Sequence, residues 1–217
     1  VSVPVPPRLA AEGDILASFP AGMTLPWGVA VGAANDLWLS DPEDVIDVHF
    51  TTAGERLDEF PLTWAGNWGG DMAFDAEHGL IWQVNVGGDN GIYALDPSDG
   101  SVEDTITGGP WDGISQRGLA YDPDNDVFYI GGWNEGIIYR VAGPSHETPG
   151  ATLDSCTPAD PNISGLAWNR SFGMLWMATN SETDTIWLID PTTCEASIGV
   201  AHPEGGGVNG AGLEMDA

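Results

Sequence analysis

The stretch GLAYDPDNDVFYIGG, residues 118–132, decides the fold, because versions of it recur along the chain. The related stretches are GVAVGAANDLWLSD from Gly28, GDMAFDAEHGLIWQVN from Gly70, GLAWNRSFGMLWMAT from Gly165 and the short copy GLEMDA from Gly212. Successive copies begin 42, 48, 47 and 47 residues apart. A period of this length is typical of a protein built from supersecondary units that bury their apolar faces against one another.

Each unit reads as four strands. An apolar strand leads into a polar turn (DAEHG, DPDND or NRSFG), and a second strand follows with an aromatic residue near its start. A third strand (GIYALD, GIIYRV or TIWLID) leads through a turn to a fourth (ERLDEF, SVEDTI, ATLDSC or EASIGV). Four strands at this period predict an all-β chain of the β-propeller type, rather than a β-sandwich. The glycine that opens each innermost strand fits a place where neighbouring backbones crowd around a central channel.

We expect one propeller domain over residues 1–217, with five blades of four-stranded antiparallel sheet. The blade cores fall near 28–62, 70–108, 118–156 and 165–200. A closing blade would combine 212–217 with 1–20, because GDILASFP (13–20) matches the outer strand GERLDEFP (54–61). This closing blade would be incomplete. Its middle strands are either missing or supplied from beyond Ala217.

The amino-acid composition excludes some classes of function. The chain has 33 acidic residues against five arginines and no lysine, with a formal net charge of −28. That charge excludes unassisted binding to nucleic acid or to an anionic membrane, and it suits a soluble secreted protein. No apolar run approaches the roughly 18 residues of a membrane span. Cys156 and Cys194 allow one disulfide, yet an ideal blade would place them at opposite ends, so their pairing stays open.

The stretch 165–217, with the other copies, resembles bacterial extracellular propellers of the NHL, YVTN and SMP-30-like group, and is similar to propeller domains attached to secreted subtilisin-like peptidases. The resemblance implies a propeller that serves as an enzyme, a lectin or a docking platform. Lactonases of the group hold a metal with Glu, two Asn and Asp. Here the innermost strands offer Asp71, Asn209 and Glu214, but not that set. Streptogramin lyases use a histidine-centred site, and the four histidines here fall at unequal blade positions. We therefore favour a non-catalytic role over an enzymatic one.

Five tryptophans do not fall at repeated strand positions. Trp27, Trp64, Trp68 and Trp111 precede innermost strands, Trp133 lies in a middle-strand loop, and all five map to one face of a propeller. Polar residues accompany them, and the expected ligand-binding set is Trp27, Trp64, Trp68, Asp71, Trp111, Asp112, Arg117, Trp133, Asn134 and Glu135. Indoles beside amides and charges suit a glycan or peptide, and they equally suit a plug at the channel mouth.

The sequence allows two roles for Arg117. It would bind an anionic ligand group such as a carboxylate, or it would neutralise Asp71 or Asp112 in a structural pair. No cofactor is specified by spacing. Ca²⁺ is the ion that acidic loops such as DPED (41–44) would hold weakly.

The main hypothesis is thus a non-catalytic extracellular binding propeller, with a glycan or protein ligand on the tryptophan-rich face. We also expect a parent polypeptide or a partner strand at the closing blade. A metal-dependent lactonase- or lyase-type enzyme with its site at the channel mouth, and a structural spacer domain, are the alternatives.

Overall fold

The computed structural model describes residues 13–66, 68–87, 90–183, 185–203 and 212–215. Its strands form four antiparallel sheets, each built from four consecutive strands of the chain. Blade 1 contains β1 (Val29–Val31), β2 (Leu37–Asp41), β3 (Ile46–Phe50) and β4 (Arg56–Pro61). Blade 2 contains β5 (Trp68–Asp75), β6 (Leu80–Val86), β7 (Gly91–Leu95) and β8 (Val102–Ile106). Blade 3 contains β9 (Gln116–Asp122), β10 (Val127–Gly132), β11 (Ile138–Ala142) and β12 (Thr152–Cys156). Blade 4 contains β13 (Ile163–Asn169), β14 (Met174–Thr179), β15 (Thr185–Ile189) and β16 (Ala196–Ala201).

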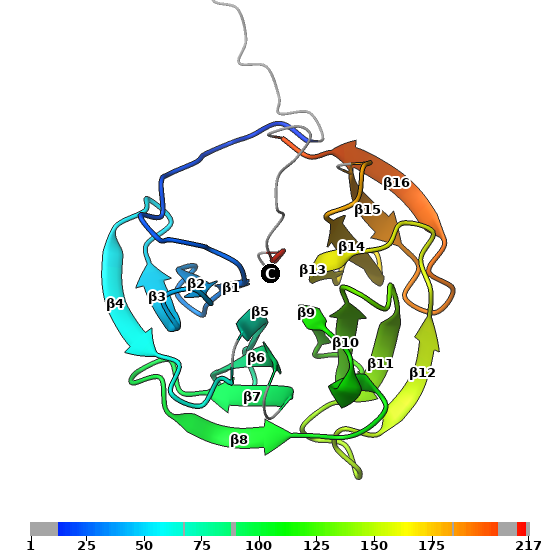
Figure 1. Ribbon diagram of the computed structural model, residues 1–217, viewed down its shortest axis with the longest axis horizontal. Coiled ribbons are helices and arrows are strands. Elements are labelled where there is room, and N and C mark those ends of the chain that lie inside the picture. The colour runs from blue at the N-terminus through cyan, green and yellow to red at the C-terminus, as the bar shows by residue number, and fades with distance from the viewer. Residues whose placement is uncertain (1–12, 67, 88–89, 184, 204–211, 216–217) are drawn as a thin grey trace, which may run out of the picture.

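The blades stand around a central axis, with β1, β5, β9 and β13 innermost and β4, β8, β12 and β16 along the rim (Figure 1). The all-β propeller and its four-stranded blades are therefore confirmed. In the part of the chain that the structure describes, the one helix is the short η1 (Trp111–Gly113), and no helix is long and apolar enough to cross a bilayer.

Apolar residues on both faces of each sheet bury themselves between neighbouring blades. Three buried clusters fill the described core, between blades 1 and 2, blades 2 and 3, and blades 3 and 4. The cluster between blades 2 and 3 contains Trp82, Trp111 and Phe128, each almost fully buried. Because a four-stranded sheet has two apolar faces, radial stacking is how the repeat removes both from water.

Backbone crowding at the axis explains the glycine at the start of the innermost strands. A Cβ on Gly28 would collide with the carbonyl oxygen of Gly70 in the next blade, and a Cβ on Gly118 would lie 2.9 Å from Leu166 Cγ in blade 4. Larger residues at these positions would push the blades apart. The expected reason for these glycines is confirmed.

The expectation of five blades is wrong, since the described chain forms four. Residues 13–20 and 212–215, which were expected to supply strands of a closing blade, contain no strand; its other parts, 1–12 and 216–217, lie outside the described residues. The match between GDILASFP (13–20) and GERLDEFP (54–61) rested on local sequence similarity. β4 is a strand because β3 supplies its hydrogen bonds, whereas no strand of the described residues pairs with 13–20.

The segment 13–26 instead follows the rim from blade 4 to blade 1 (Figure 1). Gly13 lies against Val200 of β16. Further along, the ring of Phe19 packs 5.7 Å from that of Phe50 in β3, between ring centroids. The segment therefore bridges the two blades between which the fifth was expected.

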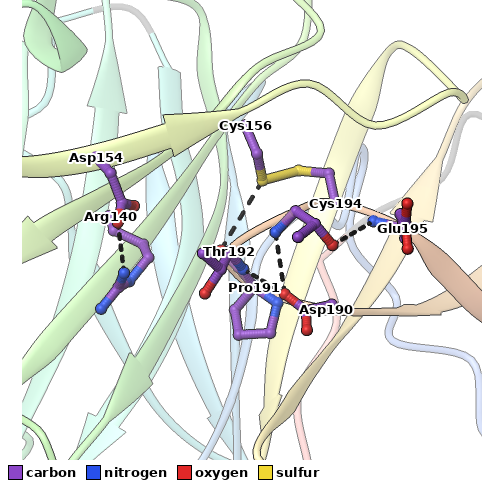
Figure 2. The surroundings of a disulfide bond; sticks show 9 residues. Arg140, Asp154, Cys156, Asp190, Pro191, Thr192, Cys194 and Glu195 are labelled. Carbon is purple, nitrogen blue, oxygen red and sulfur yellow. Dashed lines mark hydrogen bonds and ion pairs between the residues drawn. A yellow bond between two sulfur atoms is a disulfide. The ribbon is translucent and has the colours of Figure 1, made fainter.

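Cys156 and Cys194 form a disulfide with a Cα–Cα distance of 5.6 Å. Figure 2 shows Cys156 at the end of β12 joined to Cys194 in the turn that precedes β16. The outermost strands lie along the rim rather than parallel to the axis (Figure 1). Sheet twist of this kind carries the end of β12 toward blade 4, so residues at opposite ends of idealised blades meet. The bond ties blade 3 to blade 4.

Removing this disulfide is expected to lower the free energy of unfolding by about 4 kcal/mol, because a loop closed across 38 residues of sequence restricts the unfolded chain. The melting temperature of the double variant Cys156→Ser, Cys194→Ser should fall by roughly 10 °C. Reductant should produce the same fall in the unaltered protein and none in the double variant. An unchanged melting temperature after complete reduction would contradict this account.

A polar pair crosses the otherwise apolar contact between blades 1 and 2. Asp47 in β3 accepts a hydrogen bond from Gln83 Nε2 in β6 at 3.1 Å, and both residues are fully buried. Burial raises the pKa of Asp47 to about 8, while the bond from Gln83 acts in the opposite direction. Asp47 Oδ2 and Gln83 Oε1 have no partner among the described residues. Protonation of Asp47 adds an O–H donor to a pair in which two oxygen atoms have no hydrogen-bond donor among the described residues.

Between pH 4 and pH 8 the folded state therefore holds a proton at Asp47 that the unfolded state has lost, so stability falls as pH rises through this window. Asp47→Asn should remove this part of the pH dependence and raise the stability above pH 8, relative to the unaltered protein, by up to about 6 kcal/mol. Urea unfolding at several pH values measures the difference. The exposed-site control Glu55→Gln should leave the pH profile unchanged, and a profile that is equally steep in Asp47→Asn would refute the assignment.

Candidate ligand-binding site

Arg117 lies at the mouth of the central channel, at the second residue of β9. Its guanidinium carbon is 4.6 Å from the ring centroid of Trp27, 4.4 Å from that of Trp68 and 4.8 Å from that of Trp133. These distances are those of cation–π contacts. Trp27 precedes β1, Trp68 begins β5 and Trp133 follows β10, so one cation is held by three blades. We call Trp27, Trp68 and Trp133 the indole cage.

The rings of the cage also pack on one another. Trp27 and Trp68 meet edge to face, with centroids 5.2 Å apart and planes at 80°. Trp27 and Trp133 are 6.0 Å apart at 57°. Trp27 is almost fully buried, whereas Trp68, Arg117 and Trp133 are half-buried. The cage therefore has a fixed floor at Trp27 and walls that reach the surface.

The loop that carries Trp133 is fastened by hydrogen bonds on both sides. The Trp133 amide donates to Ser115 O at 2.9 Å, and its carbonyl accepts from Asn162 Nδ2 of blade 4 at 3.2 Å. Asn134 Nδ2 donates to Ser115 Oγ at 2.5 Å, and Glu135 Oε2 accepts from the Ser115 amide at 3.0 Å. Three consecutive residues, 133–135, thus bond to Ser115, two residues before Arg117, which fixes Trp133 beside the guanidinium.

Arg117 has no ion pair among the described residues. The other described arginines all have carboxylate partners, namely Arg56 with Glu59, Arg140 with Asp154 and Arg170 with Asp124. Within the described part of the chain, Arg117 Nε is buried without a hydrogen-bond partner, and so are the Nε1 atoms of Trp27 and Trp68. Burial lowers the pKa of Arg117, but an arginine remains charged at any physiological pH. The cage thus holds a positive charge, together with N–H donors that no described residue accepts.

Asp71 lies inside the channel below the cage. Its Oδ1 accepts from the amide of Val29 at 3.2 Å, and its Oδ2 accepts from Leu119 at 3.2 Å and from Leu166 at 3.0 Å. Burial raises the pKa of Asp71 well above its usual range, although the backbone donors act to lower it. Of the two Arg117 pairings that the sequence left open, the one with Asp71 is not made, since the backbone of three blades takes this carboxylate instead. Among the described residues, Arg117 forms no ion pair with Asp112 either.

Two of the five tryptophans lie outside the cage. Trp111, in η1, is fully buried between blades 2 and 3 and donates from Nε1 to Gly150 O at 2.8 Å. Asp112 follows it, and its carbonyl accepts from Asn90 Nδ2 at 2.6 Å. Trp64 packs on Tyr93, with centroids 4.3 Å apart. The structure therefore brings together Trp27, Trp68, Arg117 and Trp133, with Asn134 and Glu135 beside them.

Sequence reasoning missed the residues that support the cage. Ser115 and Asn162 fasten the Trp133 loop, and the amide of Gly212 donates to the carbonyl of Trp27. Ser115 lies just before the strand GLAYD (118–122), so the sequence repeat could have predicted its position at the channel entrance. Nothing in the sequence pointed to Asn162, whose role depends on how blades 3 and 4 meet.

The other mouth of the channel has a different character. A cavity of about 690 Å³ opens there, lined by all four blades and by the 212–215 segment, with Phe74, Tyr121, Trp168 and Glu214 on its walls. Burial raises the pKa of Glu214 well above its usual range, and the nearby Asp71 adds to the effect. Arg170 at this mouth is already paired with Asp124, so this end offers no free cation among the described residues.

The acidic loops use their carboxylates in turns. Asp41, the first residue of DPED, accepts from the amides of Glu43 and Asp44 at one oxygen and of Thr24 and Leu25 at the other. Asp122 accepts in the same way from Asp124 N and Asn125 Nδ2. Among the described residues, no group of three or more His, Cys, Asp and Glu side chains is arranged to hold a metal ion. Ca²⁺ binding stays a prediction.

Comparison with known proteins identifies the fold. No protein-family model matches the chain, and no curated protein matches it. Solved structures do, among them virginiamycin B lyase from Staphylococcus aureus, at 17% identity and a TM-score of 0.52 over 76% of this chain and 52% of the lyase. A gluconolactonase from Xanthomonas campestris matches at 19% identity and a TM-score of 0.55, over 77% of this chain and 62% of that one. A chain from a nidogen/laminin complex matches at 15% identity and a TM-score of 0.59, over 76% and 60%.

These relatives are β-propellers, and at such identities the likeness shows the fold alone. The chain spans about half the length of the lyase that it resembles. The neighbours include two enzymes and a chain from a protein complex, so they do not select one activity. Function has to be argued from the site.

Proposed function

We propose that this protein is an exported, non-catalytic binding propeller that takes a glycan or protein ligand at the indole cage. The observation that carries the proposal is the group of three buried polar atoms that have no partner among the described residues, Nε1 of Trp27, Nε1 of Trp68 and Nε of Arg117. Buried donors cost free energy unless they are bonded, so these three call for a partner that the described residues do not supply.

The chemistry of the cage favours binding over catalysis. Three indoles offer flat apolar faces on which a sugar ring or a peptide side chain stacks. Arg117 stays protonated and so is no general base, and the carboxylate of Glu135 is taken up by the Ser115 amide. The described part of the cage thus contains groups that orient a ligand and no acid–base pair poised to react.

Two further observations support export and partner binding. A disulfide persists best in an oxidising compartment, and a charge of −28 keeps a protein dispersed outside the cell. One structural neighbour comes from a nidogen/laminin complex. A protein ligand is therefore a natural candidate beside a glycan, and both are tested together.

The test is a screen of the labelled protein on a glycan array and on a displayed peptide library, followed by affinity measurement for the best binder. Trp133→Ala and Trp68→Ala should each weaken binding by about tenfold or more, because each removes a stacking surface of the cage. Both positions are half-buried walls, so the variants should keep a cooperative melting transition.

The matched control is Trp176→Phe in β14 of blade 4, which removes an indole away from the cage and should leave the affinity unchanged. Equal affinities for the cage variants and the unaltered protein would refute the proposed site. The absence of any binder on both arrays would favour the structural spacer instead.

A further inference from the structure

We propose that the ligand of the indole cage carries a carboxylate and that Arg117 is the residue that reads it. This inference rests on the proposed function and deepens it. It starts from the contrast between Arg117, without an acidic partner among the described residues, and the excess of acid in the chain, where 33 carboxylate side chains face five arginines.

Two carboxylates near Arg117, one in the channel and one in the cage loop, are already engaged. Asp71 accepts backbone amides from blades 1, 3 and 4. Glu135, in the cage loop, accepts the Ser115 amide. In a chain so rich in acid, a half-buried arginine surrounded by rings rather than by a carboxylate leaves a place for an external anion.

The geometry suits a planar anion. The three indole rings lie 4.4–4.8 Å from the guanidinium carbon and supply no oxygen acceptor, whereas the N–H donors of a guanidinium lie in its plane. Two parallel donors of this fork match the two oxygens of a carboxylate. The neighbouring indole of Trp133, on a fastened loop, then provides an apolar wall for whatever group bears the carboxylate.

A carboxylate fits better than a phosphate. Arg117 is the single cation in the described cage, and one guanidinium balances a monoanion. A phosphate dianion would need further donors or cations, and it would meet stronger repulsion from a protein of charge −28. The same carboxylate chemistry occurs at the C-terminus of a peptide and in an acidic sugar, so the experiment includes both sources.

The test uses matched acid and neutral probes. Methyl glucuronide is compared with methyl glucoside, and N-acetyl-phenylalanine with its amide, while inorganic phosphate serves as a third anion. The readout is the ¹H–¹⁵N signals of the tryptophan indoles during titration, since the rings of Trp27, Trp68 and Trp133 touch the guanidinium. The acid of at least one pair should bind about tenfold or more tightly than its neutral partner, and more tightly than phosphate.

Variants then assign the preference. Arg117→Gln should reduce the ratio of acid to neutral affinity to about one, and Arg117→Lys should recover only part of it, because lysine keeps the charge and loses the fork. Arg56→Gln, an exposed arginine paired with Glu59, is the control and should keep the full ratio.

A ratio near one in the unaltered protein overturns the inference without any variant, so a failure of Arg117→Gln to fold leaves the test intact. A ratio that survives in a folded Arg117→Gln also overturns it, as does tighter binding of phosphate than of either acid. If neutral ligands bind at the cage with the same affinity as acids, the carboxylate inference fails while the proposed function stands. If cage variants leave array binding unchanged, the proposed function itself fails.

Discussion

The carboxylate of Asp71 joins the innermost strands of all four blades. It belongs to β5 and accepts backbone hydrogen bonds from β1, β9 and β13, through Val29, Leu119 and Leu166. A β-bulge aims it at the axis, because the register of β5 against β6 shifts between Gly69 and Met72. Bulges commonly redirect one side chain in this way. The β-sheet hydrogen bonds join strands within each blade, whereas the carboxylate of Asp71 joins the innermost strands of different blades.

The cage inherits its geometry from this junction. Trp27 and Arg117 each stand two residues before an amide that Asp71 holds, Val29 and Leu119, and Trp68 stands three residues before Asp71 itself. Fixing these backbones therefore fixes where the rings and the guanidinium emerge. A buried carboxylate is costly, which is why burial raises its pKa, and the amide donors offset part of that cost. Stability and ligand site thus depend on the same group.

The sequence repeat predicted most of the fold. Strand order within a blade depends on local sequence pattern and on turns in which the side chains of Asp75, Asp122 and Asn169 accept hydrogen bonds. The repeat failed at residues 13–20, whose sequence resembled an outer strand but with which no strand of the described residues pairs. The disulfide was left open for a related reason. Strand order does not specify the twist that carries Cys156 toward Cys194.

For the site, loop position placed Trp27, Trp68 and Trp133 on one face with Arg117, and the structure brings these four side chains together. Loop position gave no information on how deeply each side chain is buried. It therefore could not distinguish the three cage tryptophans from Trp111, which is buried and bonded to Gly150, or from Trp64, which packs on Tyr93. Nor could it show that Asp71 is buried and accepts backbone amides from three blades.

Native-state hydrogen exchange tests the role of Asp71 most directly. The amides of Val29, Leu119 and Leu166 lie on three different blades, yet we expect them to exchange with one common opening free energy, equal to that of global unfolding. In Asp71→Asn all three should lose protection together, while the amide of Val48 in blade 1 remains the reference. Three unrelated exchange rates in the unaltered protein, or protection that survives in Asp71→Asn, would contradict the claim that this carboxylate holds the four blades together.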